Sequence, residues 1–394
     1  MISSSVDKPP SLLKRGGGLY FHIPFCGSIC SYCHFNRIAV HNSDLRKQFT
    51  ESVIDELKLR VNDLPLSTIY FGGGTPSQLE PELLTDILAH VRSLYKVIDD
   101  VEVTCEANPE SFTAELAEIW QSAGVNRISL GVQSLDHGVL RTLGRQCNPE
   151  TARAALKLAT SMFSNVSADW ILAPGSNVDQ LKSAFSEAAE LGVKHISFYI
   201  LELHDKTKLS DRIFAGELKM MQDDSIAELY KAGVEILRQL GFQQYEISNF
   251  AIPGYESKHN TAYWLRVPYI GVGPGASGFD GESRYKNVAE IKHWMSCVQS
   301  GKLPEDFVDF PDEESQKLEQ LFLGLRTRAG VSLELFKNVE SLEQGVTNGL
   351  WAINGQNLVL TLDGMLQIDA IEEHLAGQLG GHFKSVRTTL YRQF

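Results

Sequence analysis

Apolar strand-like runs and amphipathic helical segments alternate through the first half of the chain, with a repeat of roughly 30 residues. This alternation favours right-handed parallel βα units, and we count about six of them. The predicted strands are 19–23, 68–71, 101–107, 127–134, 166–172 and 195–201, and the predicted helices are 44–61, 80–95, 151–160, 178–192 and one after Ser111. The pattern by itself fits either a doubly wound parallel sheet or a parallel barrel.

The loop after the first predicted strand carries three cysteines in a CxxxCxxC pattern, Cys26, Cys30 and Cys33. Pro24 should end the strand and start the loop. Three thiolates this close together suit an iron–sulfur cluster better than a structural zinc ion, because zinc requires four ligands in a closed tetrahedron and no fourth Cys or HxxxH pattern follows nearby. One iron would then have no protein ligand.

The stretch from Tyr20 through HIPFC to Cys33 resembles the radical S-adenosylmethionine (SAM) superfamily, and within it the coproporphyrinogen-oxidase-like branch. The resemblance implies an α/β fold, an open (partial) parallel β/α barrel whose loops at the C-terminal strand ends hold the cofactors. It also implies that the three cysteines bind a 4Fe-4S cluster and that SAM chelates the open iron. An electron passed into the sulfonium would then release a 5′-deoxyadenosyl radical.

Glycine and polar residues at the predicted strand ends match positions that contact SAM in this branch. The run 72–76, GGGTP, follows the second strand, where glycines let the backbone approach a ligand; a simple turn is the alternative. Glu106 and Gln133 end the next two strands, where helix capping is the alternative. The resemblance implies SAM-binding roles for Tyr20, Tyr32, Gly73, Gly74, Thr75, Glu106, Gln133, Arg145 and Asp169.

Three departures from the branch pattern concern the same region. Cys147 stands where relatives often have histidine, and Ser277 stands where they have histidine in a GAHSF motif. The segment DWILAPGS, which contains Asp169, is one residue shorter than the usual DLIYGLPG. The shortened segment affects the outer edge of the expected pocket, and any role of an imidazole at position 147 is absent.

Two features distinguish between members of the branch. Coproporphyrinogen oxidases carry a further cysteine two residues past the cluster motif, where this chain has Phe35. The segment 259–264, HNTAYW, resembles the HNxxYW pattern of the heme-chaperone (HemW-type) relatives. We expect this segment to be non-helical, with His259 as an axial heme ligand and Tyr263 and Trp264 against the porphyrin face. The alternative is a core histidine with a packing pair.

The chain divides into three predicted parts. Residues 1–17 are expected to form a flexible leader, 18–303 the barrel with a family-specific extension, and 304–394 a mostly helical C-terminal domain that begins near Pro304. In the last part we expect helices over 313–328 and 333–342. A short strand, a turn at Asp363-Gly364 and a helix should follow, and these resemble the winged-helix-like tail of the same branch.

Composition limits the partners and the compartment. The chain has 36 basic and 49 acidic residues, a net charge of −13, and no basic run that could follow a phosphate backbone, so we expect no nucleic-acid partner. Three of the six cysteines, Cys105, Cys147 and Cys297, are scattered, which argues against a disulfide framework and for a reducing compartment. We see no secretory signal and no apolar span of membrane length, and we expect a cytoplasmic protein.

The leading hypothesis is a heme chaperone that binds heme and transfers it to an acceptor protein, membrane-associated acceptors included, with the cluster and SAM enabling the transfer. The rival hypothesis is an oxygen-independent coproporphyrinogen III oxidase, in which a radical abstracts hydrogen from propionate side chains before decarboxylation. A third hypothesis is an interaction protein with a relic cluster.

Overall fold

The computed structural model describes residues 16–379. All but the last two residues of the predicted leader, and residues 380–394, lie outside the described residues. Twelve strands form one sheet in the order β12-β11-β10-β9-β1-β2-β3-β4-β5-β6-β8-β7. These strands are β1 (Gly17–Ile23), β2 (Leu66–Gly73), β3 (Val97–Ala107), β4 (Arg127–Gln133), β5 (Asn165–Leu172), β6 (His195–Ile200), β7 (Gln243–Gln244), β8 (Asn249–Ala251), β9 (Tyr269–Val272), β10 (Ser277–Phe279), β11 (Arg284–Asn287) and β12 (Glu305–Asp309).

The six strands β1 to β6 are parallel and adjacent in sequence order, as the alternating pattern predicted. Strand β9 adds in parallel to the other side of β1, and β8 pairs antiparallel with β6. The two ends of the sheet, β12 and β7, do not pair with each other within residues 16–379. The predicted open parallel β/α barrel is therefore confirmed.

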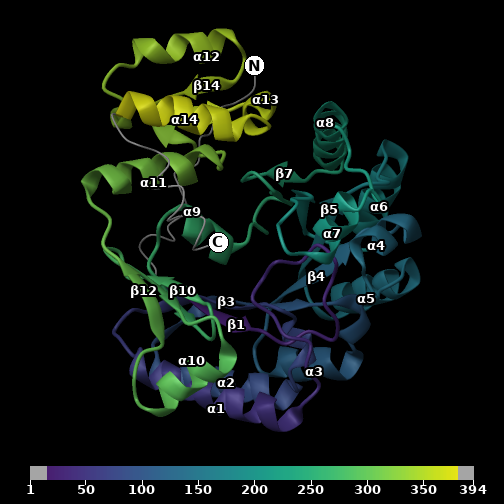
Figure 1. Ribbon diagram of the computed structural model, residues 1–394, viewed down its shortest axis with the longest axis vertical. Helices are drawn as coiled ribbons and strands as arrows, with labels where there is room; N and C mark the ends of the chain where they lie inside the picture. The colour runs from purple at the N-terminus through teal and green to yellow at the C-terminus, as the bar shows by residue number, and fades with distance from the viewer. Residues whose placement is uncertain (1–15, 380–394) are drawn as a thin grey trace.

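Helices cover the outside of this sheet (Figure 1). Those of the barrel are α1 (Ser43–Leu59), α2 (Pro81–Leu94), α3 (Ala114–Ser122), α4 (His137–Leu143), α5 (Pro149–Met162), α6 (Val178–Glu190), α7 (Lys208–Phe214), α8 (Asp223–Gln239), α9 (Lys258–Trp264) and α10 (Ile291–Gln299). Many begin where the sequence supplies a cap: Asn42 accepts the amide of Leu45 at the start of α1, and Asn177 forms a capping box on α6.

Side chains alternate along the parallel strands between an apolar outer face and a polar inner face. On β4, Ile128 and Leu130 are fully buried in the large core that the helices complete, whereas Arg127 and Ser129 occupy the inward positions. The same alternation runs through β3, with Val103 outward and Glu106 inward. The barrel interior is therefore lined by polar groups, which suits a ligand chamber better than a packed core.

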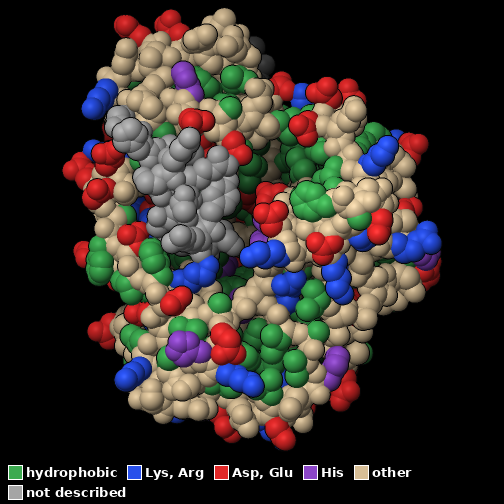
Figure 2. Space-filling model, in the orientation of Figure 1, with side chains coloured by type: hydrophobic (Ala, Val, Ile, Leu, Met, Phe, Trp, Pro, Cys, Tyr) green, Lys and Arg blue, Asp and Glu red, His purple; other side chains and the backbone are tan. Residues whose placement is uncertain are grey.

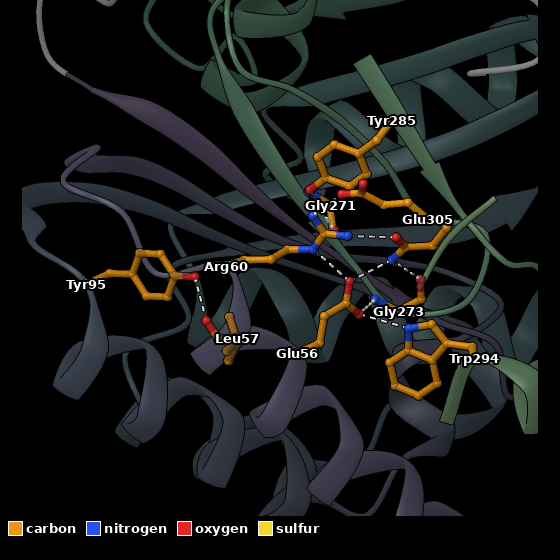
Figure 3. Close-up of polar contacts among 10 residues, drawn as sticks. Glu56, Leu57, Arg60, Tyr95, Gly271, Gly273, Tyr285, Trp294 and Glu305 are labelled. Atoms are coloured by element: carbon orange, nitrogen blue, oxygen red, sulfur yellow. Dashed lines mark hydrogen bonds and ion pairs between the residues drawn. The ribbon is translucent and has the colours of Figure 1, made fainter. Parts of the chain in front are cut away.

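A buried polar network attaches the late strands β9 to β12 to α1 (Figure 3). Glu56, fully buried, accepts hydrogen bonds from Nε of Arg60 at 2.8 Å, Nε1 of Trp294 at 2.9 Å and the amide of Gly273 at 2.9 Å. Asn287 also donates to Glu56, at 2.7 Å. Both carboxylate oxygens are satisfied, so the network tolerates burial.

The C-terminal domain forms a second hydrophobic core above the barrel (Figure 1). It contains α11 (Glu313–Leu325), β13 (Val331–Ser332), α12 (Glu343–Thr347), β14 (Trp351–Asn354), β15 (Asn357–Leu360), α13 (Leu362–Met365) and α14 (Ile368–Leu379). Its three strands make a separate antiparallel sheet in the order β13-β15-β14. Strand β12 lies beyond Pro304 but still pairs with β11, so the second core begins after the expected boundary, with α11.

Two local predictions in this domain are wrong. Only two 3₁₀ turns, Leu333–Leu335 and Glu340–Leu342, occupy the predicted helix 333–342. The side chains of Ser332 and Asn338 each accept a nearby amide and start a separate turn. The predicted turn at 363–364 lies inside α13, and the chain reverses at 355–356 between β14 and β15.

Acidic and basic side chains are interspersed over the face of the molecule shown in Figure 2. The charged side chains on this face are therefore not gathered into one area of a single sign.

Candidate cofactor site

The cysteine loop between β1 and α1 is held at several points. The amide of Cys26 donates to the carbonyl of Ile38 at 2.9 Å, which closes the base of the loop. Nε2 of His22 lies 2.6 Å from the carbonyl oxygen of Asn36, and the Asn36 amide donates to the carbonyls of Pro274 and Ala289. The loop is thus positioned by β1 and by the segments around β9 to β11, before any cofactor binds.

Two other elements contact the loop from the opposite side. The amide of Ser31 donates to the carbonyl of Leu143 at 3.0 Å, at the end of α4. The amide of Leu209, in the first turn of α7, donates to the Ser31 carbonyl at 2.8 Å. The guanidinium of Arg37 donates to the carbonyls of Cys33 and Phe35 within the loop.

The cysteine sulfurs face one cavity of about 260 Å³ at the C-terminal ends of the strands. The hydroxyl of Thr75 donates to Sγ of Cys26 at 3.5 Å, and Nη1 of Arg145 donates to Sγ of Cys30 at 3.4 Å. Burial raises the pKa of the Cys26 and Cys33 thiols, so iron binding would release protons. Three thiols on one cavity, two of them with donors at sulfur, fit an iron–sulfur cluster.

A single metal ion fits less well. Within residues 16–379 no group of three or more His, Cys, Asp or Glu side chains is close enough to hold one ion. An inorganic iron–sulfur core is larger than one ion and separates its thiolates farther.

The structure brings most of the predicted SAM residues to this same cavity. Its wall includes Tyr32, Gly73, Gly74, Thr75, Glu106, Gln133, Arg145 and Asp169. Tyr20 is different: its ring lies beside those of Tyr70 and His259, at 6.1 and 6.4 Å between centroids, and its hydroxyl is 3.2 Å from Nδ1 of His22. Tyr20 is absent from the cavity wall among the described residues, so its contact with a bound ligand would be indirect.

Two half-buried carboxylates, Glu106 and Asp169, lie on the same cavity wall. Glu106 accepts the hydroxyl of Tyr70 at 2.6 Å and the amide of Gly73 at 3.3 Å. Burial, and then the charge of Asp169, raise the pKa of Glu106 to about 7, against these hydrogen bonds. Burial also raises the pKa of Asp169, which accepts the hydroxyl of Ser129 at 3.2 Å. The pair gives the site negative charge and hydrogen-bond acceptors for a cationic, hydroxyl-bearing ligand.

Gln133 and Arg145 complete the wall on the β4 side. Gln133 has φ of 65°, in the left-handed region that non-glycine residues seldom adopt, and it also lines an adjoining cavity of about 320 Å³ next to α6. Nη2 of Arg145 donates to the carbonyl of Gly131 at 2.7 Å and to Asn108 at 3.0 Å. Arg145 therefore joins the strand end to the cysteine loop, in addition to any ligand contact.

The glycines of the run 72–76 are needed for a steric reason other than the expected approach of a ligand. A Cβ at Gly74 would lie 2.7 Å from the backbone of Pro24 and 2.8 Å from that of Ile23. Gly73 has φ of 106°, and its Cβ would lie 2.6 Å from the ring of His22. These glycines are required chiefly because the second strand end packs on the base of the cysteine loop, and not only because a ligand approaches.

The HNTAYW segment lies at the other end of the barrel. The expectation that it is non-helical is wrong: it forms α9, because Ser257 caps the Asn260 amide and Glu102 accepts the amides of Lys258 and His259. Nδ1 of His259 lies 2.7 Å from the hydroxyl of Thr68, near the start of β2. Gly73, at the cavity, is five residues farther along this strand, about 16 Å away.

His259 has no open position for a heme in this arrangement. Its side chain is 1% exposed, its Nε2 lies 2.8 Å from the hydroxyl of Tyr263, and its ring stacks on Tyr70 at 4.9 Å between centroids. Burial lowers the pKa of His259 to about 3. Trp264 packs against the C-terminal core. These contacts correspond to the alternative raised from the sequence, a core histidine with a packing pair.

Several wall residues were missed at the sequence level. Asn108, Ser129 and Tyr199 line the cavity, and the hydroxyl of Tyr70 donates a hydrogen bond to Glu106. The signal was present as period-two alternation, since each of these strands places polar residues at every second position. Two of the residues that differ from the branch pattern lie away from the cavity wall: Cys147 is buried outside it, and Ser277 belongs to β10.

No helix within residues 16–379 is long and apolar enough to cross a membrane.

Comparison with known proteins gives matches over nearly the whole chain. Residues 20–188 match the family model of the radical SAM superfamily. The heme chaperone HemW of Lactococcus lactis is 36% identical over 329 residues, which cover 83% of this chain and 86% of the relative. The heme chaperone HemW of Mycobacterium tuberculosis is 35% identical and covers 91% of this chain and 95% of its own length. A mouse mitochondrial radical SAM domain-containing protein 1 is 31% identical over 95% of this chain.

Among solved structures, the chain is similar to the coproporphyrinogen III oxidase HemN of Escherichia coli, a radical SAM enzyme. The TM-score is 0.79 over 92% of this chain and 90% of that one, at 19% identity. At this identity the similarity establishes the fold only.

Proposed function

We propose that this chain, which belongs to the radical SAM superfamily and within it to the HemW heme-chaperone family, binds heme and transfers it to an acceptor protein. The observation that carries the proposal is the match, across most of both chains, to proteins named heme chaperone HemW. The cavity at the strand ends supports it, because the residues expected to hold a cluster and SAM converge there.

We assign the residues of this cavity as follows. Cys26, Cys30 and Cys33 would hold a 4Fe-4S cluster, and Thr75 and Arg145 would donate hydrogen bonds to its sulfur ligands. SAM would lie between the glycine run and Asp169. When bound, the cluster and SAM supply one-electron chemistry that no side chain offers. The protein orients both and limits the access of water.

A direct test uses anaerobically reconstituted protein. Titration with heme, followed by absorption, should show saturable binding, and addition of an apo-hemoprotein should move the heme spectrum to that acceptor. If the protein with an intact cluster does not bind heme, the chaperone proposal fails.

The same preparation tests the other two hypotheses. Incubation with coproporphyrinogen III, SAM and a reductant without oxygen should leave the substrate unchanged, and formation of protoporphyrinogen would instead establish the oxidase activity. A Cys33→Ser variant that transfers heme as fast as the unchanged protein would support a relic cluster.

The acceptor, membrane-associated proteins included, would be a protein with an open heme site, and the compartment would be the cytoplasm. All six cysteines are free in the structure, which supports a reducing environment.

A further inference from the structure

Two histidines meet at the mouth of the cofactor cavity. His34 directly follows the cluster cysteine Cys33, and His204 lies in the loop between β6 and α7. Their rings stack with centroids 3.5 Å apart and an interplanar angle of 26°. Segments 170 residues apart in sequence thus place two imidazoles together, on the exposed side of the cysteine loop.

The nitrogens of these rings are more available than those of His259. His34 is exposed, and among residues 16–379 neither of its ring nitrogens has a hydrogen-bond or ion-pair partner. Nε2 of His204 faces Oε2 of Glu202 at 3.4 Å. His259, in contrast, is buried and has a hydroxyl on each ring nitrogen. A neutral imidazole with a free nitrogen is the usual protein ligand of heme iron.

Exposed apolar side chains lie on the cavity wall and beside the two histidines in sequence. Ile29, Phe35 and Tyr199 line the cavity mouth and are 37%, 50% and 40% exposed. Leu203, next to His204, is 38% exposed. The Phe35 ring lies 4.9 Å from that of His34. We name these four residues the mouth patch. Exposed apolar side chains grouped around metal-ligating groups mark a binding surface for a flat apolar ligand.

The loop of His204 adds no net formal charge to this surface, because Glu202, Asp205, Lys206 and Lys208, all exposed, cancel. Arg37 of the cysteine loop lines the cavity and is a nearby positive charge that acts on His34. Binding must therefore depend chiefly on iron ligation and apolar contact, with Arg37 as the cationic group beside them. A free metal ion is a weaker candidate occupant, since no group of three ligating side chains within residues 16–379 could hold one.

We infer that heme binds at the cavity mouth, with His34 as axial ligand of the iron, His204 stacked against the His34 ring, and the mouth patch against the porphyrin. This inference rests on the proposed heme-binding function and specifies its site. A heme bound there is accessible to an acceptor and lies beside the cysteine loop, whereas a heme at His259 would have to displace α9 from the barrel.

The test compares variants of the cluster-loaded protein by heme titration. His34→Ala should weaken heme binding at least tenfold and change the Soret band, and added imidazole should restore the ligated spectrum. His204→Phe keeps an aromatic ring against His34 and should bind heme within about threefold of the unchanged protein. His90→Ala, at a half-buried site on α2 outside the cavity wall, is the matched control and should have no effect.

Iron-free protoporphyrin separates the two contributions. It should bind the unchanged protein and His34→Ala equally, because it makes the apolar contacts without ligation, and Phe35→Ser should weaken both porphyrins. Iron and sulfide content should be the same in all variants, which excludes an effect through loss of the cluster.

Other outcomes would overturn the inference in distinguishable ways. If His34→Ala binds heme with the unchanged spectrum while His259→Ala loses it, heme binds through α9 and the site is wrong, although the proposed function stands. If His204→Phe loses the ligated spectrum and His34→Ala keeps it, His34 is not the ligand. If the unchanged protein does not bind heme, the proposed function itself fails.

Discussion

Cys26, Cys30 and Cys33 differ in burial but face the same cavity, so each should be needed for the cluster. Replacing any one by Ser should abolish the 4Fe-4S absorbance, since a hydroxyl does not replace a thiolate as an iron ligand. Iron and sulfide analysis of the three variants measures this. Cys297→Ser, on α10 outside the cavity wall, is the control and should retain a full cluster. Full iron retention in all three single variants would refute the assignment.

Glu106 should make SAM binding depend on pH. Its pKa is raised to about 7 by burial and by Asp169, with Tyr70, Gly73 and Arg127 acting in the opposite direction. The carboxylate form attracts a cationic ligand, so SAM affinity should rise between about pH 6 and about pH 8. Glu106→Gln should bind SAM more weakly and with a flatter pH profile. Equal pH profiles for both proteins would show that Glu106 does not contact the ligand.

The same ionisation should affect the stability of the ligand-free protein. Half-buried Glu106 keeps its proton up to about pH 7 in the folded state, whereas it ionises near its ordinary pKa of 4.5 when unfolded. The contribution of Glu106 to the stability of the folded state is therefore fully present below pH 4.5 and is lost as the pH rises through about 7. Burial also raises the pKa of Glu246 to about 7, so the two effects have the same sign. The melting temperature of Glu106→Gln should therefore fall less between these pH values than that of the unchanged protein.

Helix α1 should depend strongly on its buried glutamate. Glu56 connects Arg60, Trp294 and the β9 to β12 region, and its removal would leave Arg60 buried beside unsatisfied donors. Glu56→Ala should lower the free energy of unfolding by about 3–5 kcal/mol, as measured by urea denaturation. Asp55→Ala, on the same helix, breaks an exposed pair with Lys58 and should cost less than about 1 kcal/mol. Similar losses for both variants would show that the network does not stabilise this contact.

Three charged side chains, two of them buried, join the two cores of the molecule. Glu319 of α11 pairs with Arg266, which follows α9, at 2.7 Å and with Arg284 of β11. The amide of Ile247 also donates to the carbonyl of Arg326, at the C-terminal end of α11. The C-terminal domain is therefore held against the barrel by the ion pairs of Glu319 and by this backbone hydrogen bond.

Glu319→Ala should weaken the docking of the C-terminal domain, because buried Arg284 and half-buried Arg266 lose their shared carboxylate. Amide hydrogen exchange over residues 313–379 should become faster, at a cost of about 3–5 kcal/mol in local stability. Glu313→Ala, at an exposed site on the same helix, should leave exchange unchanged. Faster exchange confined to the barrel would show that the domains are joined by other contacts.

The sequence alone determined the six parallel strands and the position of the cysteine loop. Apolar periodicity identifies strands, and parallel strands bring their C-terminal ends to one edge. The resemblance to the radical SAM superfamily supplied the open barrel and the SAM-binding positions, Glu106 and Asp169 among them, that lie on the cavity wall. These features depend on local sequence pattern and on the order of the elements along the chain, and both can be read from the amino-acid sequence.

Only the tertiary structure decided where the histidines lie. His259 looked available among glycines and aromatics, but Glu102 and Ser257 start a helix there, and Thr68 takes one ring nitrogen. His34 and His204 show no relation in the sequence, yet they stack at the cavity mouth. Burial and pairing across 170 residues depend on the packing of the whole chain, so local pattern cannot reveal them.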